Sequence, residues 1–140
     1  MKKIPSFLFT ISLFLLFTQC RKSTEISAID NAYQLIVNKN WYLDFSKTTI
    51  GTKSTTLSYV GEPTYFIHFS KDSTTTDADG LTGNFTITKP IEQLQLNVVA
   101  KTGNNNSIKY NYLIESILDN HMSLSKKTDS VLTIYYFSNK

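Results

Sequence analysis

Residues 93–114 read QLQLNVVAKTGNNNSIKYNYLI, and they carry the clearest signal of the fold class. Apolar side chains occupy alternate positions from Leu94 to Val98 and again from Ile108 to Ile114, with mostly polar residues between them. This alternation is typical of antiparallel strands that have one face on a core and the other in water. The Gly and Asn residues between the two runs have the chemistry of a tight turn. The stretch therefore predicts a β-hairpin.

The same period of two continues on both sides of this hairpin. Further candidate strands, which bring the expected total to eight, lie at residues 41–45, 57–59, 65–69, 85–87, 122–124 and 132–136. In the first of them, Trp41, Leu43 and Phe45 are expected to share one face. The connections are too short for a crossover helix, which excludes parallel pairing. One longer polar connection, residues 71–82, is expected to be a mobile loop.

A period of 3.6 precedes the first strand. The apolar residues here fall on one helical face, at Ile29, Ala32, Tyr33, Ile36 and Val37. Ser27 is a suitable N-cap, and Asn38 follows the last apolar residue. The segment predicts one short helix packed against the strands.

One helix followed by meandering strands resembles the lipocalin-like domains of Bacteroidetes lipoproteins. The resemblance rests on residues 38–43 (NKNWYL), 110–114 (YNYLI), 122–124 (MSL) and 132–137 (LTIYYF). The resemblance implies an all-β, up-and-down, eight-stranded antiparallel barrel over residues 28–140. It also implies that Trp41 plugs the closed end of the barrel.

The N-terminus predicts export and a lipid anchor. Met1 to Lys3 is a short positive region, and the apolar run that follows is short for a membrane span. Residues 16–20 (LFTQC) resemble the lipobox of bacterial lipoproteins, and Cys20 is the one cysteine of the chain. We therefore expect a signal peptide at residues 1–19, lipidation of Cys20, a tether at residues 20–27 and an outer-membrane location. An ordinary secretory signal, or an uncleaved anchor, is the alternative.

Charge argues against nucleic acid as a partner. The chain has 14 basic and 11 acidic residues, and loss of Lys2 and Lys3 with a signal would leave 12 against 11, a net charge of +1. Nucleic-acid binding needs a concentrated basic face. A protein partner is not indicated by any motif.

The chain shows no constellation for catalysis, metal binding or a cofactor. His68 lies on the polar parity of its strand and His121 follows a turn, so both are expected to be surface histidines. Asp77 to Gly80 resembles the middle of a calcium loop, but threonine stands where the outer ligands belong, so a hairpin tip is expected. We expect no enzyme, no metal site and no cofactor.

The dense aromatic residues are the remaining functional signal. Seven of them share parity with core residues and are the expected lining of the barrel interior: Tyr59, Tyr65, Phe69, Phe85, Tyr110, Tyr112 and Tyr136. An eight-stranded barrel can hold one small ligand or can be filled by side chains. A cavity would favour an apolar or amphipathic ligand, and a filled interior would favour a module that docks a protein or glycan or inhibits a foreign enzyme.

Two short motifs suggest modification after export. Residues 72–74 (DST) and 129–131 (DSV) resemble the acceptor for O-glycosylation of exported Bacteroidetes proteins. Ser73 and Ser130 are the candidate acceptors. Because Asp and Ser also favour turns, two plain turn sequences are the alternative.

Overall fold

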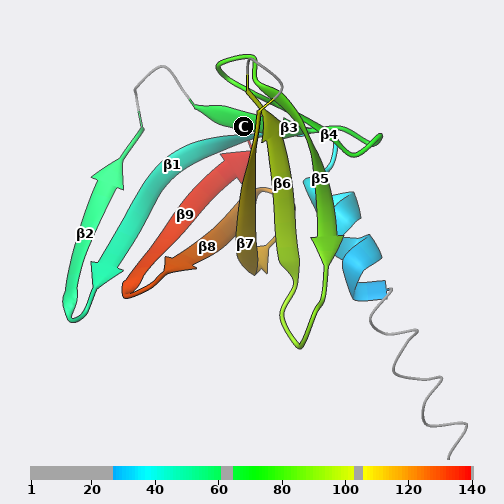
Figure 1. The fold of residues 1–140 in the computed structure, drawn as a ribbon. Coiled ribbons are helices and arrows are strands. Elements are labelled where there is room, and N and C mark those ends of the chain that lie inside the picture. The colour runs from blue at the N-terminus through cyan, green and yellow to red at the C-terminus, as the bar shows by residue number, and fades with distance from the viewer. Residues whose placement is uncertain (1–26, 61–64, 103–105, 140) are drawn as a thin grey trace, which may run out of the picture.

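The computed structural model describes residues 27–60, 65–102 and 106–139, which contain one helix and nine strands (Figure 1). The predicted signal peptide, Cys20 and most of the tether lie outside these residues. So do residues 61–64 and most of the Gly- and Asn-containing turn of the predicted 93–114 hairpin. The strands are β1 (Lys39–Ile50), β2 (Lys53–Ser58), β3 (Phe66–Phe69), β4 (Thr74–Asp77), β5 (Thr82–Thr88), β6 (Gln95–Lys101), β7 (Ser107–Ile117), β8 (His121–Thr128) and β9 (Val131–Asn139).

The strands form a closed antiparallel barrel of eight strands, as predicted. Neighbours follow the order β2-β1-β3-β4-β5-β6-β7-β8-β9, and pairing of β1 with β9 closes the ring. In this order β2 and β3 both pair with β1. β3 pairs with the first residues of β1 and β2 pairs with its last residues, on the same side. Together β2 and β3 therefore serve as one interrupted strand of the barrel wall.

The strand β4 corrects the expectation of a mobile loop at residues 71–82. It pairs with β3 on one side and with β5 on the other, over three residues each. Its sequence, TTTD, has no apolar alternation, so the period of two could not reveal it. Threonine nevertheless favours extended backbone, and Thr75 is buried inside the barrel. Gly83 allows this close packing, because a Cβ there would lie 2.4 Å from the carbonyl oxygen of Val99.

A bulge in β1 changes which side chains face inward. The pairing of β1 with β9 shifts register between Leu43 and Phe45, so that Ser46 rather than Phe45 continues the inward series. The expectation that Phe45 shares the face of Trp41 is therefore wrong. Phe45 lies on the outside of the barrel, where its ring stacks on Tyr136 with 4.3 Å between the ring centroids. A bulge inserts one residue and reverses the parity of everything after it.

The helix, residues 27–36, covers one end of the barrel. Asn38 follows it with φ of 58°, a left-handed conformation that is common after a helix and that turns the chain into β1. Figure 1 shows the helix on the side of the barrel opposite the β1–β2 hairpin. The turns after β1, β4, β6 and β8 lie at the other, open end, because strand direction alternates around the barrel.

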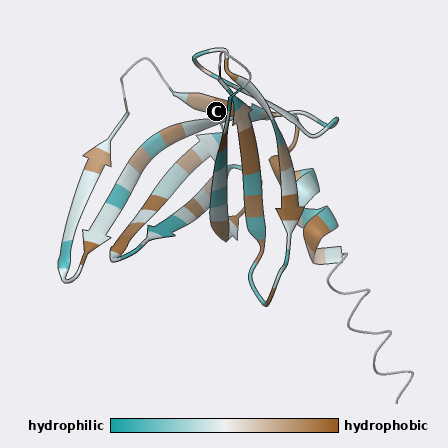
Figure 2. Ribbon diagram, in the orientation of Figure 1, coloured by the Kyte–Doolittle hydropathy of each residue, from teal (hydrophilic) through white to brown (hydrophobic). Residues whose placement is uncertain are grey.

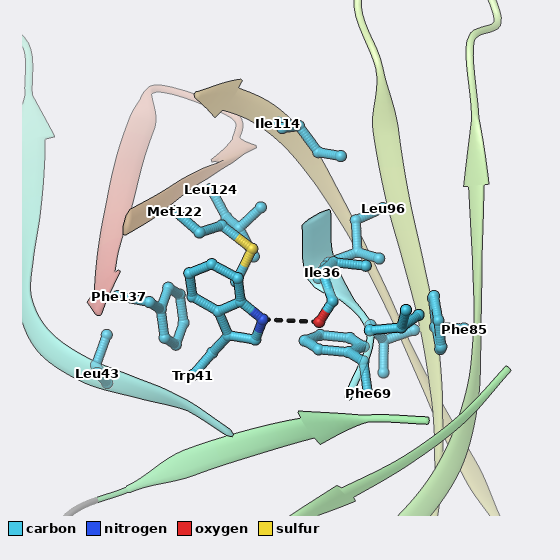
Figure 3. Packing of buried hydrophobic residues seen from close by; sticks show 12 residues of the cluster. Ile36, Trp41, Leu43, Phe69, Phe85, Leu96, Ile114, Met122, Leu124 and Phe137 are labelled. Atoms are coloured by element: carbon cyan, nitrogen blue, oxygen red, sulfur yellow. Dashed lines mark hydrogen bonds between the residues drawn. The ribbon is translucent and has the colours of Figure 1, made fainter. Parts of the chain in front are cut away.

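Trp41 fills the closed end. Its side chain is fully buried, and Nε1 donates a hydrogen bond to the carbonyl oxygen of Ile36 at 2.9 Å (Figure 3). Nζ of Lys39 lies 5.7 Å from the centroid of the indole ring and forms an ion pair with Asp119 at 2.5 Å. The helix, the indole and this lysine together seal one end of the barrel.

The hydrophobic core spreads from Trp41 into the barrel. Hydrophobic and hydrophilic residues alternate along β6, which reflects one face in the core and one in solvent (Figure 2). The largest fully buried apolar side chains are Trp41, Phe69, Phe85, Ile36, Leu96, Met122 and Leu124. The core is therefore concentrated toward the helix end, which leaves the other end less filled.

Candidate ligand cavity

A cavity of about 350 Å³ lies inside the barrel. Its wall comes from β1, β3, β6, β7, β8 and β9 and from the residues that link β2 to β3. The lining residues are Leu43, Tyr59, Tyr65, Ile67, Phe69, Leu96, Val98, Tyr112, Leu124, Tyr135 and Phe137. Among the described residues that line it, the side chains are thus aliphatic, phenyl or phenol.

The floor of this cavity is the core around Trp41. Phe69, Leu124 and Phe137 are buried, and each belongs both to the cavity wall and to the cluster that contains the indole. Figure 3 shows Phe69 and Phe137 on either side of Trp41. A ligand that entered from the open end would therefore meet a purely apolar floor.

Four tyrosines give the wall its polar atoms. Burial, together with a smaller effect of the nearby Asp77 carboxylate, raises the pKa of Tyr65 to about 12. Burial likewise raises the pKa of Tyr112 and of Tyr135 above the usual value of 10.0. These phenols therefore stay protonated at neutral pH, where each can donate one hydrogen bond. Tyr59 is the fourth tyrosine of the cavity wall.

A smaller cavity of about 150 Å³ adjoins the first and shares Tyr65, Ile67, Val98 and Tyr112 with it. It lies nearer the open end and adds Tyr110 and the more polar residues Thr75 and Asp77.

The tyrosine rings form a continuous series between the two cavities. Tyr110 stacks on Tyr112 with 6.1 Å between centroids, and Tyr112 meets the edge of Tyr135 at 5.9 Å.

The structure brings five of the seven predicted lining residues to these cavities. Tyr59, Tyr65, Phe69 and Tyr112 line the larger one, and Tyr110 lines the smaller one.

Phe85 and Tyr136 correct the other two expectations. Phe85 points inward but is packed between Phe69 and Tyr33 of the helix, so it belongs to the sealed end. Tyr136 faces outward and stacks on Phe45.

Tyr135 is the lining residue that strand parity missed. Apolar residues occupy both faces of β9, so parity alone favours neither Tyr135 nor Tyr136, and the expected lining residue is Tyr136. The register with β8 would have resolved this. The two-residue turn between β8 and β9 places Tyr135 opposite Leu124, whose inward direction is clear from the sequence. A short hairpin turn fixes the register and so the face.

The histidines and Asp77 satisfy local hydrogen bonds. His68 faces outward, and its Nδ1 lies 2.7 Å from Oδ1 of its cross-strand neighbour Asn40. Nδ1 of His121 lies 2.8 Å from Oδ1 of Asn120. Oδ1 of Asp77 accepts hydrogen bonds from two amides of the β4–β5 turn. Residues 77–80 thus form a hairpin tip, as expected. No group of three or more potential metal ligands occurs within the described ranges.

The two candidate glycosylation sites differ in exposure. Ser130 is exposed in the β8–β9 turn. Ser73 is half-buried with φ of 65°, and its carbonyl oxygen accepts a hydrogen bond from the amide of Phe85. Cys20 lies outside the described residues.

The part of the chain that the structure describes has no helix long and apolar enough to cross a membrane. Comparison of the chain with protein-family models, with curated proteins and with solved structures gave no match.

Proposed function

We propose that this protein is a noncatalytic binding barrel that holds one small apolar or amphipathic molecule and is anchored in the outer membrane through lipid on Cys20. The observation that carries the binding function is the cavity of about 350 Å³ inside a closed barrel. This volume lies at the lower end of the range for small-molecule sites, roughly 300–1,000 Å³. A barrel filled by side chains would instead favour the alternative, a module that docks a protein or glycan.

The wall supports this class of ligand. Its floor is apolar, and its polar atoms are phenol hydroxyls gathered among Tyr59, Tyr65, Tyr112 and Tyr135. Small-molecule sites typically combine apolar walls with a few hydrogen-bonding groups that orient the ligand. The same wall supports a noncatalytic role, because its described residues include no histidine, carboxylate or aliphatic hydroxyl that could serve as nucleophile or base.

The anchor and the family rest on other observations. The lipid anchor and the location are proposed from the sequence around Cys20. Membership of the lipocalin-like family is supported by the closed barrel and by the buried indole of Trp41 at its helix end. Nucleic acid is not among the proposed partners, since the basic residues are scattered along the chain.

A cavity-filling variant tests the binding function. Val98 lines both cavities and is buried, so Val98→Phe should fill the space where they meet. The neighbouring Val99 points to the other face of β6, which makes Val99→Phe the matched control. The assay is titration with the apolar dye N-phenylnaphthylamine, whose fluorescence rises in an apolar site.

We expect the wild type and Val99→Phe to bind the dye at one site, and Val98→Phe to lose binding while it remains folded by circular dichroism. Absence of saturable dye binding by the wild type, or equal binding by all three proteins, would refute the proposal. If the wild type binds the dye, native mass spectrometry of the protein purified from its own host is the measurement that identifies the natural ligand.

A docking function has one observation in its favour. Phe45, Tyr136 and His121 line a shallow cleft on the outside of the barrel. Phe45 is 36% exposed, which is high for a phenylalanine with a stacked partner. If this cleft is the functional surface, Phe45→Ala should abolish capture of the partner and leave dye binding unchanged.

A further inference from the structure

We propose that the ligand is a single-chain anionic amphiphile whose acyl chain lies in the cavity and whose carboxylate pairs with Lys126. This inference deepens the proposed binding function and depends on it. The juxtaposition that carries it is a lysine directed into the barrel beside the tyrosines of the cavity.

Strand register places Lys126 inside the barrel. Met122 and Leu124 of β8 are buried in the core, and Lys126 is the next position of the same parity toward the open end. It pairs with Thr133 of β9, two residues from the cavity residue Tyr135. Lys127 has the opposite parity and is exposed. Of these two adjacent lysines, only Lys126 is therefore directed at the ligand.

A contact of the ammonium group places it beside a residue of the smaller cavity. Nζ of Lys126 lies 5.5 Å from the ring centroid of Tyr110, which lines the smaller cavity and stacks on Tyr112 of both. Lys126 is half-buried. Within residues 27–60, 65–102 and 106–139, the single ion pair joins Lys39 to Asp119 at the closed end. No carboxylate of the described chain therefore neutralises Lys126.

The surrounding groups favour an anion over a cation. The buried phenols of Tyr65, Tyr112 and Tyr135 stay protonated, because burial raises their pKa, and so they offer O–H donors. Donors together with an ammonium group suit a carboxylate, which accepts hydrogen bonds only. A cationic head group would be repelled by Lys126.

Two acidic residues at the open end lie on the wall opposite Lys126, and a third, Asp129, is exposed in the β8–β9 turn and forms no ion pair with Lys126. Asp77 and Asp79 belong to the β4–β5 hairpin, and β4 is separated from β8 by three strands on one side of the ring. Both raise the pKa of Tyr65, which places them on that side of the cavity. One oxygen of Asp77 already accepts hydrogen bonds from two backbone amides. Near the open end of the described strands, Lys53 is a further charged residue at an inward position, and it is exposed at the tip of β2.

The volume limits the apolar part of the ligand. A space of about 350 Å³ fits one medium-length chain and excludes a lipid with two full-length chains. Because each buried methylene contributes about 0.8 kcal/mol, affinity should rise about fourfold per methylene until the chain reaches the floor at Phe69 and Phe137. Beyond that length it should stop rising.

The test compares three probes that share a ten-carbon chain: decanoate, decanol and decyltrimethylammonium. Each is titrated by calorimetry, below its micelle concentration, into the wild type, Lys126→Met and Lys127→Met. Methionine keeps an unbranched apolar chain of similar length. Lys127→Met removes the same charge from the neighbouring position on the outside, so it controls for net charge.

We expect the wild type and Lys127→Met to bind decanoate about ten- to a hundredfold more tightly than decanol, the preference typical of a charge-assisted hydrogen bond. Lys126→Met should lose this preference and keep its affinity for decanol. Equal affinity of the wild type for decanoate and decanol, a preference for the ammonium probe, or an unchanged preference in Lys126→Met would overturn the inference and leave the binding function standing. If none of the probes and no dye binds, both proposals are wrong.

Discussion

Replacing Trp41 with alanine should destabilise the barrel more than any other single truncation of an aromatic residue. The indole of Trp41 on β1 is fully buried, and its Nε1 donates a hydrogen bond to the carbonyl oxygen of Ile36 in the helix. Truncation of a buried tryptophan costs about 3–5 kcal/mol. The carbonyl oxygen of Ile36 would also lose its side-chain partner, which favours the upper part of that range.

Smaller changes at the same site separate these contributions. Trp41→Phe keeps a ring but removes the donor, so it should cost about 1–3 kcal/mol. Lys39→Met removes the cation over the indole and the ion pair with Asp119. Because Asp119 is 89% exposed, solvent screens that pair, and the total loss should be below about 1 kcal/mol.

Thermal and urea unfolding measure these losses. For a domain of this size, about 4 °C of melting temperature corresponds to 1 kcal/mol, so Trp41→Ala should melt about 12–20 °C lower. Tyr136→Ala is the control, since its ring stacks on Phe45 outside the barrel and is worth about 0.5–1.5 kcal/mol. Equal destabilisation by Trp41→Ala and Tyr136→Ala would refute the assignment of Trp41 as the plug. The chain has one tryptophan, so a water-like emission maximum of the native protein would refute it independently.

Three further outcomes are expected. Cys20→Ser should move the protein from the membrane fraction to a soluble or unprocessed form, and fractionation like the wild type would contradict the anchor. Because burial raises the pKa of Tyr65 from 10.0 to about 12, and raises that of Tyr112, the unfolded chain loses these protons at a lower pH than the native barrel. Their contribution to stability is therefore complete below pH 10 and is lost as the pH rises toward 12. The urea concentration at the midpoint of unfolding should fall across this interval. A constant midpoint would argue against burial of these phenols. If the native host glycosylates the protein, the exposed Ser130 should be the acceptor rather than the half-buried Ser73, and an intact mass equal to peptide plus lipid would exclude the modification.

Periodicity was sufficient to predict the fold class and most of the strands. In β6, and in β7 as far as Ile114, apolar and polar residues mostly alternate, because one face meets the core and the other meets water. The helix was also predictable from its apolar face, and the observed helix ends close to the predicted position. Both signals are local, so they survive without knowledge of the tertiary structure.

The expected number of barrel strands came from a partly wrong set. Periodicity counted β2 and β3 as two strands, although they share one position beside β1, and it missed β4. The two errors cancelled. Which strands share a position depends on pairing between distant residues, and pairing leaves no trace in the hydrophobic period of a single strand.

The candidate site was predictable only where parity was unambiguous. Phe69 and Tyr112 lie on strands, Tyr65 directly precedes one, and all three reach the cavity wall, as their parity predicts. In β9 both faces are apolar, so parity alone does not show which of Tyr135 and Tyr136 lines the cavity. Lys126 shares the parity of Met122 and Leu124, but a lysine in an alternating strand is ordinarily on the outer face, and the pairing of β8 with β9 is needed to show that the inward series continues to it.

The position of the helix also sets the direction from which the cavity can be reached. The described chain enters the barrel at the sealed end, and the turns around the mouth lie at the far end of the strands. A molecule held by its N-terminus, whether by lipid on Cys20 or by a tag on a surface, would thus present its mouth to the surrounding solution. A ligand of the proposed cavity would then enter from the aqueous phase and not directly from the bilayer. Immobilisation through the C-terminus would also leave the mouth free, because β9 ends beside the plug, so either terminus can serve for capture experiments.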